Sequence, residues 1–319
     1  MRQIKFCRAC IVLYCSLFIL AGCSQKPYHK ETRIMMGTFV EITCQDKTAM
    51  NAAFEEIKKI ENIANKFSPA SEISRLNKNG EIKASPDFLN LIKESKKYYA
   101  LSGGAFDITV SPLVDTWKNK IKEALEKKSE NLLPAEDELG DKLTLVGSDK
   151  IFINQKESLV KFTQSGMSID LGGIAKGYAV DKAVLRLKAL GINSCLINAG
   201  GNIYCLGKKG KRKWHIGIQH PRNPGKLLFY LDLENQAVAT SGDYEQYFML
   251  AGKRYSHIIN PETGYPVDNG LASVTIITKY ATTADILSTT VFVLGKEKGQ
   301  ALLEKIANTE YRIIEEKDL

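Results

Sequence analysis

Three short stretches of the sequence carry side chains that could do chemistry. The first, DLGGIAKGYAVD (170–181), places a carboxylate, two glycines and a lysine ahead of a segment that reads as a helix. Glycines let backbone N–H groups approach a ligand closely, and the start of a helix attracts anions. The spacing fits neither the Walker loop nor the dinucleotide fingerprint. The stretch is therefore either a phosphate-binding turn or a helix start that Asp170 merely caps.

The second stretch, TTADILSTT (282–290), sets Asp285, Ser288 and Thr289 at positions i, i+3 and i+4. This spacing brings the three side chains onto one face of a helix. One carboxylate and neighbouring hydroxyls supply the hard oxygen ligands that Mg²⁺ prefers. Thr282 lies three residues before Asp285, so a capping box at the helix start is the alternative interpretation.

The third stretch, RYSHIINPETGYP (254–266), places His257 at a strand end just before a Pro-Glu-Thr-Gly turn. A histidine with a pKa near neutrality beside a loop can act as a general base. A purely structural histidine is the alternative at this position.

The N-terminus has the features of an export signal. Arg2, Lys5 and Arg8 precede an apolar run over residues 9–21, which is too short to span a bilayer comfortably. The run ends in Leu-Ala-Gly-Cys at 20–23, which resembles a bacterial lipobox. We expect residues 1–22 to be a lipoprotein signal peptide, Cys23 to be acylated and residues 23–30 to be a tether. A plain signal peptide with a chance cysteine is the alternative.

The composition bounds the remaining possibilities. The chain has 319 residues, 44% apolar and 25% charged, which is typical of a globular protein. Removal of the signal peptide lowers the net charge from +8 to +5, and no basic cluster with interleaved aromatic residues appears, so we expect no nucleic-acid partner. Besides Cys23 the mature chain keeps Cys44, Cys195 and Cys205. Cys195 and Cys205 could pair, but we favour two buried free thiols in adjacent strands.

Periodicity predicts the elements that position these residues. A strand is expected over 33–44, and a helix over 48–67 whose apolar face runs from Phe54 to Phe67. A short helix follows near 77, and another begins at Pro86 and ends near 102. The charged segment 118–142 is interpreted as a surface excursion.

In the second half, short strands dominate over 143–170, including MSID at 167–170. A helix is expected over 172–190, then several strands up to residue 278, and helices over 283–294 and 297–307. Strands and helices mix without strict βαβ alternation. We therefore predict an α+β fold with mixed, largely antiparallel sheets flanked by helices.

The motifs occur together in a recognisable order. These are MMGT (35–38), FSPASEISRLN (67–77), GAFDITVSPLV (104–114), DLGGIAKGYAVD, NAGGN (198–202), TSGDYE (240–245), YSHIINPETGYP and ADILSTTVFVLG. In this order and spacing the chain resembles the ApbE family of lipoproteins, the FAD:protein FMN transferases. The resemblance covers roughly residues 31–315, so residues 31–319 are expected to form one ApbE-like domain.

The resemblance implies an activity and partners. Enzymes of this family cleave the diphosphate of FAD with Mg²⁺, attach FMN to a threonine of a target protein and release AMP. The acceptor would be a subunit of a membrane electron-transfer complex, reached from outside the cytoplasm. This implies a location at the periplasmic side of the inner membrane if the organism is Gram-negative. The alternatives are an FAD pyrophosphatase that gives FMN and AMP, and a non-catalytic flavin-binding lipoprotein.

The resemblance also assigns residues. His257 would take the proton of the acceptor threonine, and the metal would be held by Gly173, Asp285, Ser288 and Thr289. The residues implied for FAD are Met36, Phe67, Ala105, Phe106, Asp107, Asp170, Lys176 and Ile259. The chain departs from the family at Asn260 and Ser288, where relatives carry aspartate, and Lys176 is not uniform in the family.

Overall fold

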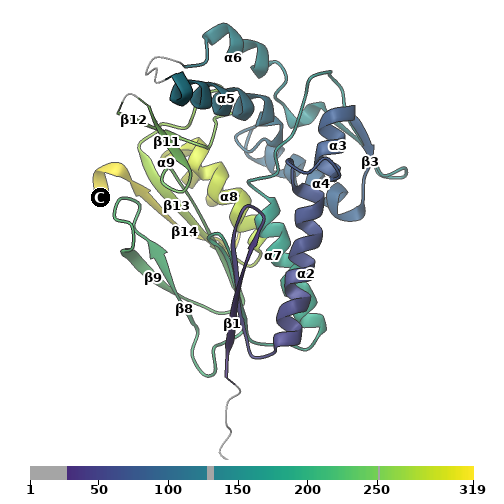
Figure 1. Ribbon diagram of the computed structural model, residues 1–319. Helices are drawn as coiled ribbons and strands as arrows, with labels where there is room; N and C mark the ends of the chain where they lie inside the picture. The colour runs from purple at the N-terminus through teal and green to yellow at the C-terminus, as the bar shows by residue number, and fades with distance from the viewer. Residues whose placement is uncertain (1–26, 128–132, 251) are drawn as a thin grey trace, which may run out of the picture.

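The computed structural model describes residues 27–127, 133–250 and 252–319 (Figure 1). The predicted signal peptide and Cys23 lie outside these residues. No helix in the described part of the chain is long and apolar enough to cross a membrane.

A seven-stranded sheet runs through the molecule, in the order β1-β2-β6-β7-β10-β13-β14. Every described strand pairing is antiparallel, which confirms the predicted α+β class. All eight residues of β13 are buried, because both faces of the sheet are covered there. The strands are β1 (His29–Met35), β2 (Thr38–Cys44), β6 (Cys195–Ala199), β7 (Asn202–Leu206), β10 (Gln236–Gly242), β13 (Leu271–Thr278) and β14 (Glu310–Glu315).

Three helices cover one face of this sheet (Figure 1). Helix α2 (Lys47–Ala64) packs on α7 (Ala175–Ala189), and α7 packs on α8 (Ala281–Leu294), which lies over β10 and β13; α9 (Lys296–Leu303) follows α8. The other face is covered by the hairpin of β8 (Trp214–Gln219) and β9 (Leu227–Leu233). Trp214, Ile216 and Ile218 of β8 pack there against Val238 and Ile277 of the sheet.

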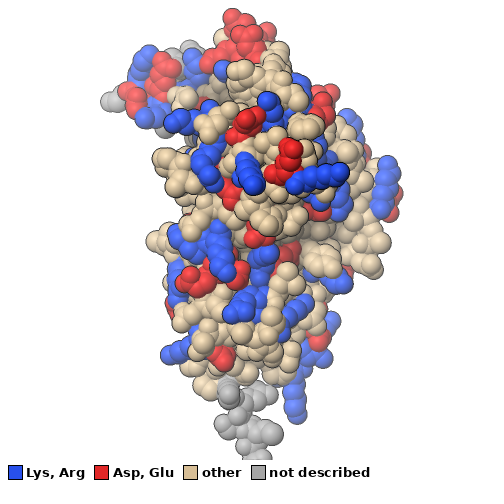
Figure 2. Space-filling model, turned by 90° about the vertical axis from the view of Figure 1, so that its right-hand side faces the viewer, with Lys and Arg blue, Asp and Glu red and all other residues tan. Residues whose placement is uncertain are grey.

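A second group of elements packs beside the helices. It contains α3 (Glu72–Asn79), α4 (Pro86–Leu101), α5 (Ser111–Lys127) and α6 (Glu136–Leu143), together with a small sheet of β3 (Glu81–Lys83), β5 (Leu159–Phe162) and β4 (Ile151–Asn154). Figure 2 shows basic and acidic side chains interspersed over the face on which α2, α3 and α4 lie. A further hairpin, β11 (Tyr247–Leu250) and β12 (Lys253–Ser256), leads into the segment of His257.

The structure corrects the interpretation of 118–142 as a mere surface excursion. Helices α5 and α6 bury apolar side chains of their own, since Trp117, Ile121 and Leu139 are at most 8% exposed and cluster with Leu113 and Ile259. Most charged residues of the two helices are exposed or half-buried, and one of them, Lys118, lines the cavity described below.

Several predicted boundaries are also wrong. The expected strand 33–44 is a hairpin, because Met36 and Gly37 form a two-residue turn with φ of 54° and 72°. The expected tether extends too far: its last two residues belong to β1, and the ring of Tyr28 packs edge-on against Trp214 at 5.6 Å. Residues 167–170 form no strand, and helix α2 ends at Ala64, which leaves Phe67 in a loop.

The three cysteines of the described chain are buried and free, as the sequence favoured. Cys195 and Cys205 lie on the adjacent strands β6 and β7, where each faces a leucine of the neighbouring strand in the register.

Candidate active site

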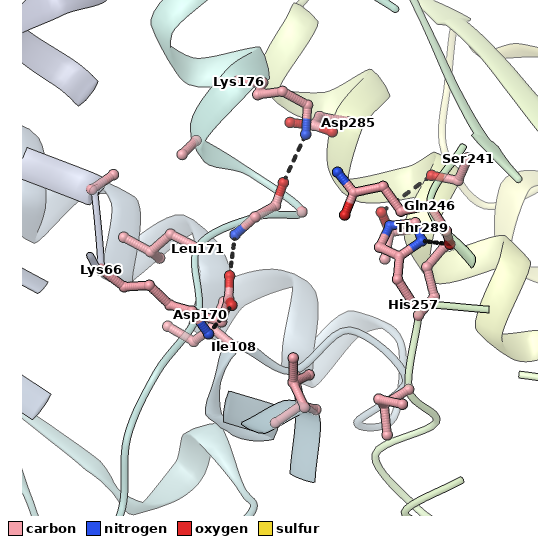
Figure 3. A pocket seen from close by; sticks show the side chains of 18 of the residues that line it. Lys66, Ile108, Asp170, Leu171, Lys176, Ser241, Gln246, His257, Asp285 and Thr289 are labelled. Atoms are coloured by element: carbon pink, nitrogen blue, oxygen red, sulfur yellow. Dashed lines mark hydrogen bonds and ion pairs between the residues drawn. The ribbon is translucent and has the colours of Figure 1, made fainter. Parts of the chain in front are cut away.

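A cavity of about 590 Å³ brings most of the predicted site residues together. Its walls come from the β1–β2 turn, the short 3-10 helix at Ile108–Val110, the start of α7, the inner side of α8 and the segment around His257. Figure 3 shows Asp170 and His257 on opposite sides of this space. Of the thirteen residues predicted for flavin, metal and catalysis, twelve line it: Met36, Phe67, Ala105, Phe106, Asp107, Asp170, Gly173, Lys176, His257, Ile259, Asp285 and Thr289.

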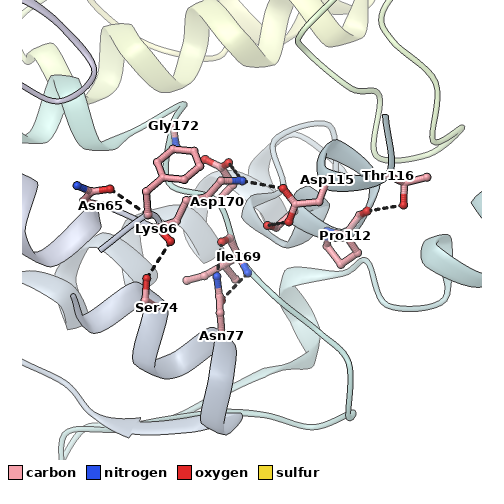
Figure 4. A network of polar contacts seen from close by, with 12 residues as sticks. Asn65, Lys66, Ser74, Asn77, Pro112, Asp115, Thr116, Ile169, Asp170 and Gly172 are labelled. Carbon is pink, nitrogen blue, oxygen red and sulfur yellow. Dashed lines mark hydrogen bonds and ion pairs between the residues drawn. The ribbon is translucent and has the colours of Figure 1, made fainter. Parts of the chain in front are cut away.

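One wall is held by an ion-pair network around Asp170 (Figure 4). Lys66 lies 2.8 Å from Asp170 and 3.1 Å from Asp115, while the N–H of Gly172 donates to Asp170 over 2.8 Å. Burial opposes ionisation of Asp170, but Lys66 and the Gly172 N–H outweigh it and hold its pKa below the ordinary value. Asp170 is therefore an anion that shapes the turn before α7.

The structure decides against Asp170 as the cap of α7. The residue at the cap position is Ile174, whose side chain accepts no hydrogen bond; the Ala175 N–H donates instead to the Leu171 carbonyl over 2.8 Å. Gly173, Ala175 and Lys176 place the start of α7 at the cavity, where the positive end of the helix dipole favours an anion. Lys176 adds a positive charge at this end, and its Nζ donates to the Gly172 carbonyl over 3.1 Å.

Helices α7 and α8 approach very closely beside this helix start. A Cβ at Gly177 would lie 2.3 Å from the Ala281 carbonyl oxygen and 2.8 Å from the Asp285 Cβ, so only glycine fits. The N–H of Gly177 donates to the Asp285 carboxylate over 2.9 Å. The glycine therefore sets the position of Asp285 against the start of α7.

The capping-box alternative for Asp285 is also excluded by the geometry. The N-terminus of α8 is capped by Asp181 of α7, whose carboxylate accepts from the N–H groups of Ala281 and Thr282 and from the Thr282 hydroxyl, over 2.6–2.8 Å. Asp285 takes no part in this cap. Its carboxylate is free to face the cavity.

Asp285 is a buried acid in an unusual polar environment. The residue is 4% exposed, and burial raises the pKa of its carboxyl, while Lys176, the Gly177 N–H and the Asn202 amide act in the opposite direction. The amide oxygen of Asn202 is buried without any hydrogen-bond partner. A carboxylate beside an unpartnered amide oxygen is an arrangement that a small cation would complete.

The two hydroxyls predicted beside Asp285 differ in their placement. Thr289 lines the cavity, with its Oγ1 3.3 Å from the Ser241 hydroxyl. Ser288 does not line it: its hydroxyl donates to the Asp285 carbonyl over 3.0 Å and lies 2.9 Å from Ser241. The side chain of Ser288 lies in the interface between α8 and the sheet. This placement does not support the predicted role of Ser288 as a direct metal ligand.

His257 is held in one tautomer. Its Nδ1 lies 2.8 Å from the Gln246 carbonyl oxygen, which can only accept, so Nδ1 carries the hydrogen and Nε2 carries the lone pair of the neutral ring. Burial, with smaller effects from Lys176 and Lys118, lowers the pKa of His257 to about 4. The imidazole is therefore neutral near pH 7 and can accept a proton at Nε2.

Comparison with known proteins identifies the family. The model of the ApbE family matches residues 36–313. The chain belongs to the ApbE family. A FAD:protein FMN transferase from Haemophilus influenzae is 32% identical over 318 aligned residues, covering 92% of this chain and 89% of its own.

Solved structures of ApbE proteins share the fold. The ApbE protein from Thermotoga maritima aligns with a TM-score of 0.81 and 34% identity over 91% of this chain and 95% of its own. The flavin transferase ApbE from Vibrio cholerae aligns with a TM-score of 0.76 and 27% identity over 91% of this chain and 98% of its own. The family expected from the sequence is thus confirmed.

Two residues that the ApbE resemblance implies for FAD have distinct surroundings. The Asp107 carboxylate accepts from the N–H and hydroxyl of Thr109 and from the N–H and hydroxyl of Ser148, so its oxygens are already engaged. Burial nevertheless raises the pKa of Asp107. Phe67 is 82% exposed at the cavity mouth, where a flat ring could lie against it.

The sequence interpretation missed Lys66, Asn202 and Glu245, which also line this ApbE cavity. Low water access, with a smaller effect of Asp285, raises the pKa of Glu245 to about 7. Each of the three lies within or beside a motif that was noticed, namely FSPASEISRLN, NAGGN and TSGDYE. Their role was hidden because their partners lie far away in the sequence, as Asp170 does for Lys66.

Proposed function

We propose that this chain transfers FMN from FAD to a threonine of an acceptor protein and releases AMP. The observation that carries the proposal is the neutral His257, whose ring shares one cavity with Asp285 and with the start of α7. A proton acceptor beside a site for phosphates is what attack of a hydroxyl on a diphosphate needs.

The proposed reaction is attack of the threonine hydroxyl on the diphosphate of FAD. The threonine oxygen forms a bond to the FMN phosphorus, and the bond between that phosphorus and the bridging oxygen breaks. AMP leaves with the bridging oxygen. The threonine proton passes to Nε2 of His257, which is neutral before the step. The backbone N–H groups at the start of α7 and the Lys176 ammonium stabilise negative charge on the phosphates.

The residues around Asp285 fit a magnesium ion. Within the described part of the chain no group of three or more His, Cys, Asp or Glu is arranged for a metal, so a thiolate or imidazole site is not favoured. Asp285, the Thr289 hydroxyl, the Gly173 carbonyl and the unpartnered Asn202 oxygen form a hard-oxygen set with little formal charge. Such a set suits Mg²⁺, which keeps waters and binds phosphates. When bound, the ion supplies positive charge beside the diphosphate.

The rest of the cavity suits the flavin nucleotide. Apolar side chains including Phe106, Ile259 and Val293 line the cavity together with the exposed ring of Phe67, which suits the flavin ring, and the many polar and charged side chains of the lining suit the phosphates and hydroxyls of the nucleotide. Lys66 fixes Asp170, whose carboxylate in turn accepts a hydrogen bond from the Gly172 N–H. We therefore assign Asp170 to shaping of the phosphate turn.

We further propose that the enzyme works outside the cytoplasm, held by acyl chains on Cys23. An exported flavin-carrying subunit of a membrane electron-transfer complex would be the acceptor. Several acyl chains on one residue bind a membrane far more firmly than a single chain does.

One experiment separates the candidate activities. Purified protein is incubated with FAD, Mg²⁺ and threonine-containing peptides, and AMP, free FMN and flavin-labelled peptide are measured together. Transfer predicts one labelled peptide per AMP. Free FMN with unlabelled peptide would identify an FAD pyrophosphatase, and tightly retained FAD without AMP would identify a flavin-binding lipoprotein.

A further inference from the structure

A second cavity of about 520 Å³ adjoins the proposed flavin site. The two cavities share seven lining residues, among them His257, Lys176 and Glu245. His257 therefore stands at the boundary between them. A group placed in the second cavity would lie next to the imidazole without displacing a nucleotide from the first.

The second cavity has a different lining from the first. Its walls include the turn at Asn198–Gly201 and Gly217, Ile218 and Gln219 of β8, which do not line the first cavity, and the turn at Met36–Thr38, of which only Thr38 belongs to the second cavity alone. At Gly200 a Cβ would lie 2.5 Å from the Thr38 hydroxyl, so the two turns touch through a glycine backbone. The lining is mostly polar and contains four glycines and the side-chain amides of Asn198, Gln219 and Gln246, besides the charged Lys176 and Glu245. Such walls are suited to hydrogen-bond another peptide backbone rather than a flat apolar ring.

Strand β8 offers a free edge beside this cavity. It pairs with β9 alone, and alternate residues of an antiparallel strand direct their N–H and C=O groups away from the partner. Within the described residues no other strand takes these groups. An unpaired edge of this kind binds extended peptides by adding a strand to the sheet.

We propose that this second cavity, the acceptor groove, binds an extended segment of the acceptor polypeptide along the edge of β8. The threonine hydroxyl of that segment would then face Nε2 of His257 at the boundary of the two cavities. The inference rests on the proposed transferase activity. It adds the place and the conformation in which the acceptor binds.

A matched pair of substitutions on β8 tests the groove. Gln219 lines it, whereas His215 points to the same side of the strand four residues earlier and does not line it. The probe is an array of short synthetic peptides, each with one central threonine, from which the peptide with the strongest flavin label is chosen. We expect Gln219→Trp to raise the KM for this peptide about tenfold or more and to leave the FAD dissociation constant unchanged. His215→Trp should change neither quantity.

Hydrogen exchange supplies a second readout. Binding of the peptide selected from the array should slow the exchange of backbone amides within Trp214–Gln219, because the amides on the free edge become hydrogen-bonded. The acceptor groove would be contradicted if Gln219→Trp left the KM for the peptide unchanged. It would also be contradicted if the FAD dissociation constant rose by the same factor as the KM for the peptide. Release of AMP by the unaltered enzyme without any labelled peptide would instead contradict the transferase itself.

Discussion

At the scale of single residues, the proposed proton transfer depends on His257. The Gln246 carbonyl fixes its tautomer, and burial keeps the ring neutral, so Nε2 is ready to accept a proton. His257→Ala should lower the rate of flavin transfer by about 100-fold to 10,000-fold, the usual contribution of a general base. FAD affinity should be nearly unchanged, since the ring is one of many contacts. Equal losses in transfer and in FAD binding would make His257 a structural residue.

The low pKa of His257 gives a pH dependence with a definite sign. Its ordinary value of 6.5 falls to about 4 in the fold, so the ring stays neutral as pH falls from 7 to 5 and is protonated only near 4. The rate of flavin transfer should therefore fall to half of its maximum at about pH 4, where half of the His257 rings are protonated. The profile is best measured in a Glu245→Gln background, because the pKa of Glu245 lies at about 7. A midpoint near 6.5 in that background would show an unperturbed histidine.

At the scale of elements, the contact between α7 and α8 sets the geometry of the site. Gly177→Ala would force a Cβ against the Ala281 carbonyl and push the helices apart. We expect a loss of about 1–3 kcal/mol in the free energy of unfolding, measured by urea denaturation, together with weaker FMN transfer. Gly140→Ala on α6 is the control: its Cβ would meet nothing within 4 Å, so stability should rise slightly or stay unchanged.

The elements themselves were largely predictable from periodicity. Strand β13 ends at the expected residue 278 and helix α4 runs from Pro86 to within a residue of the expected end, because turn residues or a proline bound them. The alternation over 33–44 concealed a hairpin, because the backbone of Met36 adopts a left-handed conformation that residues other than glycine rarely adopt. Its N–H donates to Glu61 of α2 over 2.7 Å, a tertiary contact that no local pattern contains.

The site was predictable where a motif carries its own geometry. Asp285 and Thr289 share a helix face by spacing alone, and both line the cavity. Spacing could not separate Ser288 from them, because the direction of α8 against β10 decides which hydroxyl faces the cavity. Nor could spacing find the unpartnered oxygen of Asn202, because Asn202 lies on strand β7, far from α8 in the sequence.

At the scale of the whole molecule, β1 connects the N-terminal end of the described chain to the candidate active site. The strand enters from the N-terminal segment at His29 and reaches the cavity at its turn with β2 (Figure 1). Seven residues at about 3.3 Å each hold the cavity roughly 20 Å from the point of entry. A lipid anchor would thus leave the site facing proteins at the membrane surface.

The anchor itself is testable by fractionation. The exported chain should sediment with membranes, resist extraction by salt and dissolve in detergent, because acyl chains rather than charges hold it. Cys23→Ala should appear in the soluble fraction and take up no labelled fatty acid. Cys15→Ala, which alters only the predicted signal peptide, should stay in the membrane fraction. A Cys23→Ala protein that remains acylated or membrane-bound would refute the lipobox interpretation.

Asp285 provides the most direct test of the account, which holds that a divalent cation beside this carboxylate is needed to cleave FAD. Asp285→Asn preserves the shape of the side chain and can still accept from the Gly177 N–H, but it removes the negative charge. AMP release from saturating FAD should be measured for both proteins across a range of Mg²⁺ concentrations. We expect Mg²⁺-dependent release of AMP by the unaltered enzyme and almost no release of AMP by Asp285→Asn at equal FAD occupancy. Near-normal AMP release by Asp285→Asn would contradict it.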